Sequence, residues 1–93
     1  MRIDGLLIDE HVLDKIESRH GVTYDEAAER QCFSPWRAIR RWNRDLVKVF
    51  GRTASGRYLL VVIADHHDRE WWIVTARDMT ASERRLYGKA KHR

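Results

Sequence analysis

Residues 46–77 read LVKVFGRTASGRYLLVVIADHHDREWWIVTAR. Three runs rich in Val, Ile, Leu and Trp lie in this stretch, at residues 46–52, 57–65 and 69–77, and short polar segments separate them. Such a pattern is typical of antiparallel strands joined by tight hairpins. The middle run is apolar at consecutive positions over residues 59–63, as in a strand covered on both faces. The stretch therefore predicts a three-stranded antiparallel sheet with the middle run at its centre.

The N-terminal segment predicts a short strand followed by a helix. Residues 6–8 are apolar, and Asp9 is a suitable N-cap for a helix over residues 10–19. Gly21 then ends this helix. Side chains at the spacing of one helical face are Val12, Leu13, Ile16 and His20.

Two capping boxes predict two further helices. Thr23 precedes Glu26 by three residues and Thr80 precedes Glu83 by three, so each side chain can bond the backbone N–H of the other residue. The first box opens a second N-terminal helix, and the second box opens a C-terminal helix. Leu86, Tyr87 and Ala90 would share one side of the C-terminal helix.

A basic, Trp-containing connector precedes the sheet. Ser34 and Pro35 stand in the order of an N-cap and a first helical residue, so residues 36–43 form either a short helix or a basic loop. Because aromatic rings stack on unpaired bases while arginines hold phosphates, the connector can bind RNA. The alternative is that its Trp rings anchor it on the domain. The candidate RNA-binding residues here are Arg37, Arg40, Arg41, Arg44, Trp36 and Trp42.

Together these elements predict a single α+β domain over residues 1–93. Its order is a short strand, two helices, the connector, three antiparallel strands and a C-terminal helix. The N-terminal strand can extend the sheet to four strands. A chain of 93 residues is too short to divide into two parts that each hold a core.

Charge is segregated along the chain. The formal net charge is +4, but residues 1–35 carry −4, residues 36–64 carry +6, residues 65–79 carry −2 and residues 80–93 carry +4. Basic groups gathered in one region attract a polyanion more strongly than the same groups scattered over the surface. The pattern favours a nucleic-acid partner over a merely solvated basic surface.

Several classes of protein are disfavoured. The single cysteine, Cys32, can form neither an internal disulfide nor a thiolate metal site, which indicates a reducing, intracellular setting. Residues 59–64 are the longest apolar run and are too few to span a bilayer, and residues 1–5 lack the features of a signal peptide. We therefore expect a cytoplasmic protein with no membrane partner. The sequence has no glycine-rich phosphate loop or nucleophile elbow.

Two segments, residues 9–32 and 52–87, resemble the BrnT toxins of the RelE-like superfamily, in the family's order and over about two thirds of the chain. The chain departs from the family at Ile8, where a Trp is usual, and in residues 33–44, which are more basic and richer in Trp. The matching features are Lys15, HGVTYDEA at 20–27, GR at 51–52, GRYLLVV at 56–62, IVTAR at 73–77 and ERRLY at 83–87.

The resemblance implies a compact RelE-like fold. It also implies an endoribonuclease that cleaves mRNA, free or on the ribosome, without a metal or any other cofactor. A cognate antitoxin protein would neutralise it.

Metal-free RNA cleavage needs a base for the ribose 2′-hydroxyl, an acid for the leaving oxygen and cations around the phosphorane-like charge. Arginine stays protonated, so it stabilises charge but does not shuttle protons. Each candidate also has a structural alternative: strand-end arginines solvate a sheet edge, His20 or Glu83 caps a helix, and Tyr87 packs. The catalytic candidates are Arg77, Arg52, His20, Tyr87 and Glu83, and the further phosphate-binding candidates are Arg57, Arg84, Lys15 and Arg19.

No metal site is predicted. Asp65, His66, His67 and Asp68 are neighbours in a tight turn and would point in diverging directions. Two other functions remain open beside the ribonuclease. One is a non-catalytic nucleic-acid-binding module, which would bind in a salt-dependent way without cleavage. The other is a RelE-like protein that acts by binding a protein target.

Overall fold

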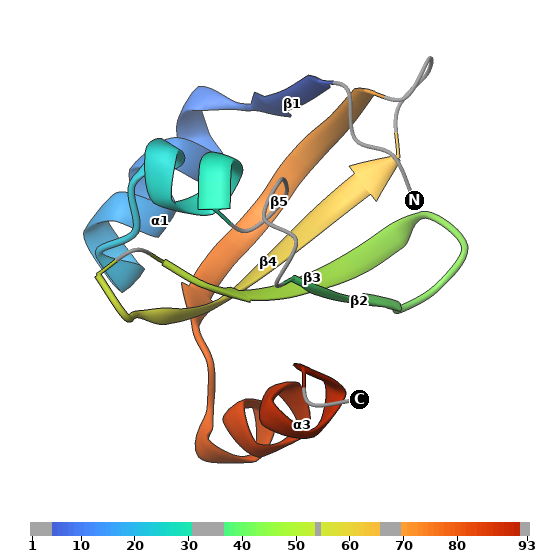
Figure 1. Cartoon of the computed structure of the whole chain (residues 1–93). Coiled ribbons are helices and arrows are strands. Elements are labelled where there is room, and N and C mark those ends of the chain that lie inside the picture. Colours follow the sequence, from blue (N-terminus) through green and yellow to red (C-terminus); the bar gives the residue numbers. More distant parts are fainter. Residues whose placement is uncertain (1–4, 31–36, 54, 66–69, 92–93) are drawn as a thin grey trace.

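A computed structural model describes residues 5–30, 37–53, 55–65 and 70–91. The described part is an α+β arrangement in which two α-helices and a short π-helix flank a mixed β-sheet (Figure 1). Among the described residues, no helix is long and apolar enough to cross a membrane. The elements are β1 (Gly5–Ile8), α1 (Glu10–His20), η1 (Glu26–Arg30), β2 (Ala38–Arg41), β3 (Leu46–Arg52), β4 (Tyr58–Asp65), β5 (Glu70–Asp78) and α3 (Ala81–Lys91).

The three strands predicted from residues 46–77 are present as β3, β4 and β5, and each pairs with the next in antiparallel register. β4 is at the centre of the sheet, as its doubly apolar sequence predicted. The prediction of a three- or four-stranded, wholly antiparallel sheet is wrong. The sheet has five strands in the order β1-β5-β4-β3-β2, and β1 pairs with β5 in parallel.

The extra strand comes from the connector. Ala38–Arg41 form β2, which pairs antiparallel with β3 at the edge of the sheet, so neither the short helix nor the basic loop is correct. An edge strand tolerates charged side chains because one side of its backbone faces away from the sheet. The local sequence carries a weak strand signal here, and pairing with β3 decides the conformation.

The prediction of a second N-terminal α-helix is also wrong. The capping box does form: Glu26 accepts the backbone N–H of Thr23 at 3.0 Å, and Thr23 Oγ1 accepts the backbone N–H of Glu26 at 3.2 Å. The chain then makes a π-helical turn, η1, that packs Ala27 and Ala28 into the core. A capping box specifies where a helix starts, but it does not specify how far the helix continues or how tightly it is wound.

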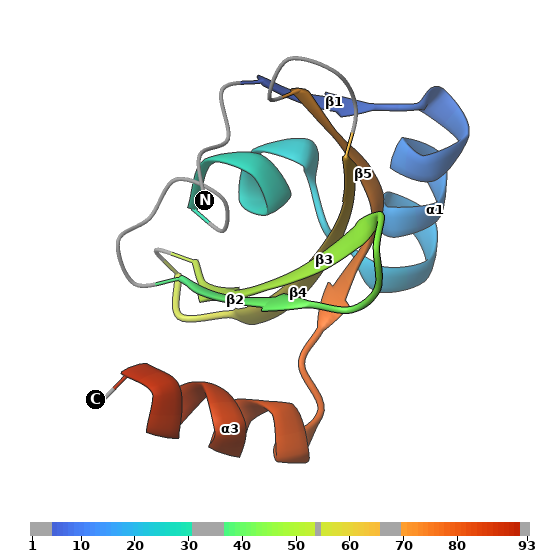
Figure 2. The ribbon, with the colours of Figure 1, turned by 90° about the vertical axis from the view of Figure 1, so that its right-hand side faces the viewer.

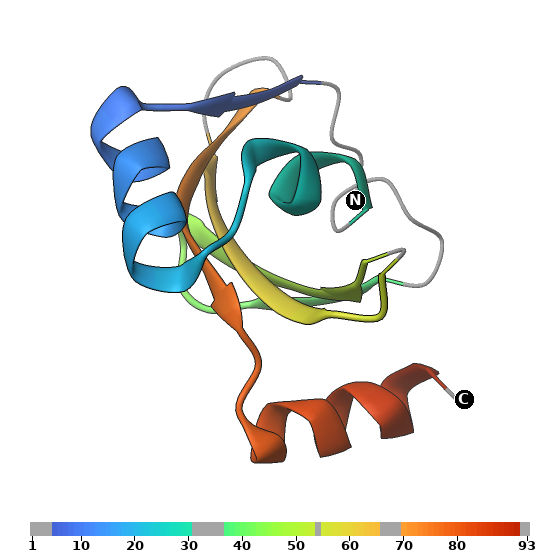
Figure 3. The same cartoon turned by 90° about the vertical axis from the view of Figure 1, so that its left-hand side faces the viewer.

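Two hydrophobic cores lie on opposite faces of the curved sheet. Figure 3 shows α1 and η1 on one face and α3 on the other, and Figure 2 shows the same arrangement from the opposite side. The larger core joins α1 and η1 to alternate residues of the strands, among them Leu59, Val61 and Ile73. The smaller core consists of Leu60, Val62, Met79 and Tyr87.

The helix faces agree only in part with the prediction. α1 begins after the predicted N-cap, since Asp9 accepts the backbone N–H of His11 at 2.8 Å, and it ends at Gly21, whose φ is 62°. In α3, Tyr87 is buried but Leu86 is 52% exposed, so these two side chains do not share a buried face.

An irregularity in β5 sets the direction of its last side chains. Val62 pairs with Thr75 and Ile63 pairs with Ile73, which leaves Val74 as an extra residue in β5. Beyond this bulge the alternation of faces is reversed, so Ala76 faces the larger core. Arg77 consequently points toward α3, and Asp78 points toward the end of α1.

Candidate functional site

Arg57 holds the end of α1 to the end of β5. Its guanidinium donates to the backbone carbonyls of His20 at 2.6 Å and Gly21 at 2.7 Å, which α1 leaves without helical partners. It also donates to both carboxylate oxygens of Asp78, at 2.6 and 3.0 Å, and lies 3.6 Å from Glu26. We name this group the Arg57 clasp. All of these contacts are internal to the fold.

The clasp keeps its charges in the ionised form. The hydrogen bond from Arg57 lowers the pKa of Asp78, and the charges of His20 and Arg84 lower it further. The hydrogen bond to Asp78 in turn raises the pKa of Arg57. The charges of His20 in α1 and of Arg84 in α3 thus both favour the ionised form of Asp78 in β5.

Arg77 and Glu83 form a second ion pair, which joins β5 to α3. The two guanidinium nitrogens of Arg77 donate to the two carboxylate oxygens of Glu83, at 2.8 and 3.0 Å. Glu83 also accepts the backbone N–H of Thr80 at 2.8 Å, as the second capping box predicted. The bond from Arg77 is the main cause of a Glu83 pKa of about 2. Glu83 is thus a carboxylate at neutral pH with its oxygens occupied.

Arg52 and Arg84 differ from these arginines. Both are exposed, and their guanidinium carbons lie 5.4 and 5.5 Å from the ring centroid of Tyr58. Neither makes an ion pair or a side-chain hydrogen bond within the part of the chain that the structure describes. We name Arg52, Tyr58 and Arg84 the arginine–tyrosine cluster. It presents two positive charges that are available to an anion.

The β3–β4 turn positions Arg52 and directs Arg57 away from it. Arg52 is the register partner of Tyr58, while Arg57 points to the opposite face. Gly56 has φ 93°, and a Cβ at this position would lie 3.3 Å from a guanidinium nitrogen of Arg52. The two arginines that flank the turn in sequence therefore have different surroundings.

A surface hollow connects the clasp to the cluster. It is lined by Gly56, Arg57, Tyr58, Asp78, Met79 and Arg84. His20 is half-buried, and its backbone carbonyl accepts from Arg57, one of the residues that line the hollow. The hollow thus places the exposed cation of Arg84 beside the ion pair of Arg57 and Asp78.

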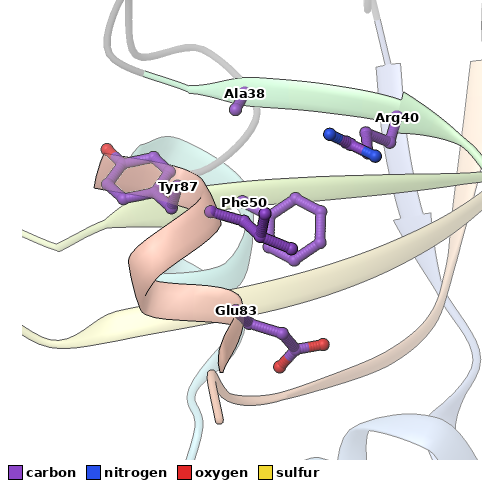
Figure 4. A pocket seen from close by; sticks show the side chains of 6 residues that line it. Ala38, Arg40, Phe50, Glu83 and Tyr87 are labelled. Carbon is purple, nitrogen blue, oxygen red and sulfur yellow. The ribbon is translucent and has the colours of Figure 1, made fainter. Parts of the chain in front are cut away.

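Tyr87 lies beside this region but is enclosed. It is 3% exposed, and its ring meets that of Tyr58 edge to face with centroids 6.0 Å apart. Burial raises the pKa of its hydroxyl. Figure 4 shows Tyr87 and Glu83 on α3 beside Phe50 of β3, with Ala38 and Arg40 on the neighbouring β2. The packing role weighed from the sequence agrees with this burial.

The remaining RNA-binding candidates lie in two other places. Lys15 and Arg19 are exposed on α1, across the sheet from α3. Within the connector, residues 38–41 form the edge strand β2, while Trp36 lies outside the described residues. Those on or next to β2 and its turn are Arg37, Arg40, Arg41, Trp42 and Arg44.

The structure describes only part of the turn at residues 65–68, for which no metal site was predicted. Asp65 is at the end of β4, whereas His66, His67 and Asp68 lie outside the described residues, as does Cys32. Within residues 5–30, 37–53, 55–65 and 70–91, no three His, Cys, Asp or Glu side chains gather in a way that could hold a metal.

Sequence reasoning assigned no role to Tyr58, Asp78 or Lys48. Tyr58 lies in a matched family motif, and the β3–β4 register would have placed it opposite Arg52. The position of Asp78 depends on the β5 bulge, and that of Lys48 depends on the presence of β2, so no local signal could have found them.

The chain resembles a known ribonuclease toxin in structure. No protein-family model matches the chain, and no curated protein matches its sequence. The crystal structure of the ribonuclease toxin BrnT from Brucella abortus superposes with a TM-score of 0.68 at 12% identity, covering 82% of this chain and 96% of that one. The predicted resemblance to BrnT is confirmed at the level of the fold. This chain has the fold of the Brucella abortus ribonuclease toxin BrnT.

Proposed function

We propose that this protein is the toxin of a bacterial toxin–antitoxin system and cleaves mRNA as a metal-independent endoribonuclease. The observation that carries the proposal is the arginine–tyrosine cluster, with two uncommitted guanidinium groups on the fold of a ribonuclease toxin. A cognate antitoxin would neutralise the activity.

Arg52 and Arg84 bind the scissile phosphate in this mechanism. As the ribose 2′-oxygen attacks phosphorus, negative charge grows on the non-bridging oxygens, and fixed cations stabilise that charge. The products are a 2′,3′-cyclic phosphate and a 5′-hydroxyl. Cations that already have internal carboxylate partners are poorly suited to this task, which favours Arg52 and Arg84 over Arg57 and Arg77.

His20 is the preferred proton-transfer group. Imidazole is the side chain most often used for proton transfer, and half-buried His20 is bonded through its backbone carbonyl to Arg57, which lines the same hollow as Arg84. Glu83 and Tyr87 fit this role less well, because Glu83 is held ionised by Arg77 and the Tyr87 hydroxyl is buried with a raised pKa. Arg57 and Arg77 act through position: they fix the ends of α1 and α3 beside the site.

The test is cleavage of an end-labelled RNA by the purified protein in the presence of EDTA. Arg52→Ala and Arg84→Ala should each lower kcat/KM on the order of 100-fold. Arg85→Ala removes an exposed charge of the same helix as Arg84 and should leave kcat/KM unchanged. A 2′,3′-cyclic phosphate at the new end would support attack by the 2′-hydroxyl.

The alternatives predict other results. Folded protein that binds RNA without cutting it would replace the ribonuclease by a binding module. Growth arrest on induced expression with mRNA of normal length would indicate a protein target. Cleavage that is lost in EDTA and restored by a divalent cation would contradict metal independence.

A further inference from the structure

The β2–β3 hairpin presents an exposed aromatic ring among basic side chains, at a distance along the sheet from the arginine–tyrosine cluster. Trp42 follows β2 and is 56% exposed, the largest exposure among the described large hydrophobic side chains. Residues 38–48 contain four basic residues and one acidic residue, Asp45. An exposed aromatic ring among basic side chains is the combination that sites for single-stranded nucleic acid use.

The turn that carries Trp42 is well ordered by hydrogen bonds. The backbone N–H of Trp42 donates to the carbonyl of Leu46 at 3.0 Å, and Asn43 Oδ1 accepts the N–H groups of Asp45 and Leu46, each at 3.0 Å. Arg41 also donates to the carbonyl of Arg44 at 3.0 Å. The ring therefore projects from a fixed turn, which lowers the entropy lost when a ligand binds.

Positive charge lies beside the ring and on the neighbouring residues of the hairpin. The Lys48 ammonium lies 4.7 Å from the Trp42 ring centroid. Arg40 is the register partner of Lys48 on the adjacent strand, and Arg44 is exposed in the turn. Stacked bases and nearby phosphates are the combination that such a surface recognises in an unpaired strand.

The same sheet face continues to the arginine–tyrosine cluster. Lys48, Phe50 and Arg52 alternate with the buried residues of β3, so all three point to the α3 side. Four residues of a strand span about 13 Å, so one single-stranded segment can contact both Lys48 and Arg52.

We propose that the β2–β3 hairpin is a separate binding site for single-stranded RNA, in which Trp42 stacks on an unpaired base while Arg40, Arg44 and Lys48 contact phosphates. The site takes its ligand class from the ribonuclease proposed above, but it needs no catalytic step. It would hold the substrate beside the cleavage site and favour unpaired over duplex RNA.

The experiment measures the binding of fluorescently labelled oligonucleotides by anisotropy. A 2′-O-methyl RNA strand lacks the attacking hydroxyl and cannot be cleaved, so binding is read independently of catalysis. Trp42→Ala should weaken binding of this strand about tenfold, and Trp42→Phe should restore most of it. Arg44→Ala should weaken binding and reduce its salt dependence, whereas Arg85→Ala, a charge-matched change on α3, should have a smaller effect.

Three outcomes would overturn the proposal. One is that Trp42→Ala binds the single strand with unchanged affinity. Another is that Trp42→Ala weakens the binding of a duplex of the same sequence as much as that of the single strand. The third is an absence of binding by the folded native protein at low salt. Circular dichroism would verify that each variant is folded. Normal binding by a protein that never cleaves RNA would reject the ribonuclease while retaining this site.

Discussion

At the scale of single residues, four arginines predicted to surround a phosphate divide into two kinds. Arg57 and Arg77 are bonded to carboxylates, whereas Arg52 and Arg84 lie over an aromatic ring without such partners among the described residues. The same guanidinium chemistry therefore supports the fold in one case and remains available to a ligand in the other. Neighbours, and not residue type, decide this difference.

The Arg77–Glu83 pair should make the free energy of unfolding depend on pH in the acidic range. The pKa of Glu83 is lowered from 4.5 to about 2, so its ionised form favours the folded state. Its contribution is complete above about pH 4.5 and is lost as the pH falls toward 2. We expect Glu83→Gln to lower the free energy of unfolding at pH 7 by about 1–2 kcal/mol, allowing for the solvent that reaches Arg77.

Urea unfolding between pH 2.5 and pH 7 would measure this effect. The difference between the native protein and Glu83→Gln should shrink as the pH falls. Glu17→Gln, an exposed change on α1, serves as the control and should leave the pH dependence as it is. A difference that stays constant over the range would show that Glu83 acts through packing.

At the scale of elements, the Arg57 clasp joins three segments that are far apart in sequence. Arg57 donates to backbone carbonyls at the end of α1 and to the Asp78 carboxylate at the end of β5. It also lies near the Glu26 carboxylate. Arg57→Ala should therefore lower the free energy of unfolding by about 2 kcal/mol, since four hydrogen bonds, one of them part-buried, are lost together.

The matched control for the clasp is Arg19→Ala, which removes an exposed arginine of α1. Its effect on the free energy of unfolding should stay within about 0.5 kcal/mol. Native stability in Arg57→Ala combined with a loss of RNA binding would instead assign Arg57 to the phosphate, as the sequence first suggested.

At the scale of the whole molecule, the two cores are unequal. α1 and η1 cover the larger one, whereas α3 is attached to the smaller one by the buried ring of Tyr87 and by the Arg77–Glu83 pair. Hydrogen exchange reports such local differences in stability. Tyr87→Ala should speed the exchange of α3 amides much more than that of β3 and β4 amides, because the ring is removed from the smaller core.

Two variants separate the roles of the α3 side chains. Leu86→Ala should change exchange little, since Leu86 is 52% exposed. Tyr87→Phe should preserve the protection of α3 amides, because the packed ring remains. Loss of RNA cleavage in Tyr87→Phe with normal exchange would show that the hydroxyl takes part in the reaction, contrary to the role given to His20.

Features that depend on neighbouring residues could be predicted from the amino-acid sequence. Alternation, turn residues and capping chemistry predict the bounds of β3, the places of β4 and β5 along the chain and the central position of β4. They also predict the N-cap and the end of α1 and both capping boxes. These are local signals, acting over a few residues along one segment.

The remaining features could not be predicted from local patterns, because they depend on which segments meet in the folded protein. Residues 38–41 form the strand β2 because they pair with β3, and β1 pairs in parallel because it lies beside β5. The bulge at Val74 sets the directions of the Arg77 and Asp78 side chains. The division of the arginines into bonded and available groups follows from these pairings. A charged side chain bonds whatever the fold brings near it, and contacts between distant segments leave no periodic signal in the sequence.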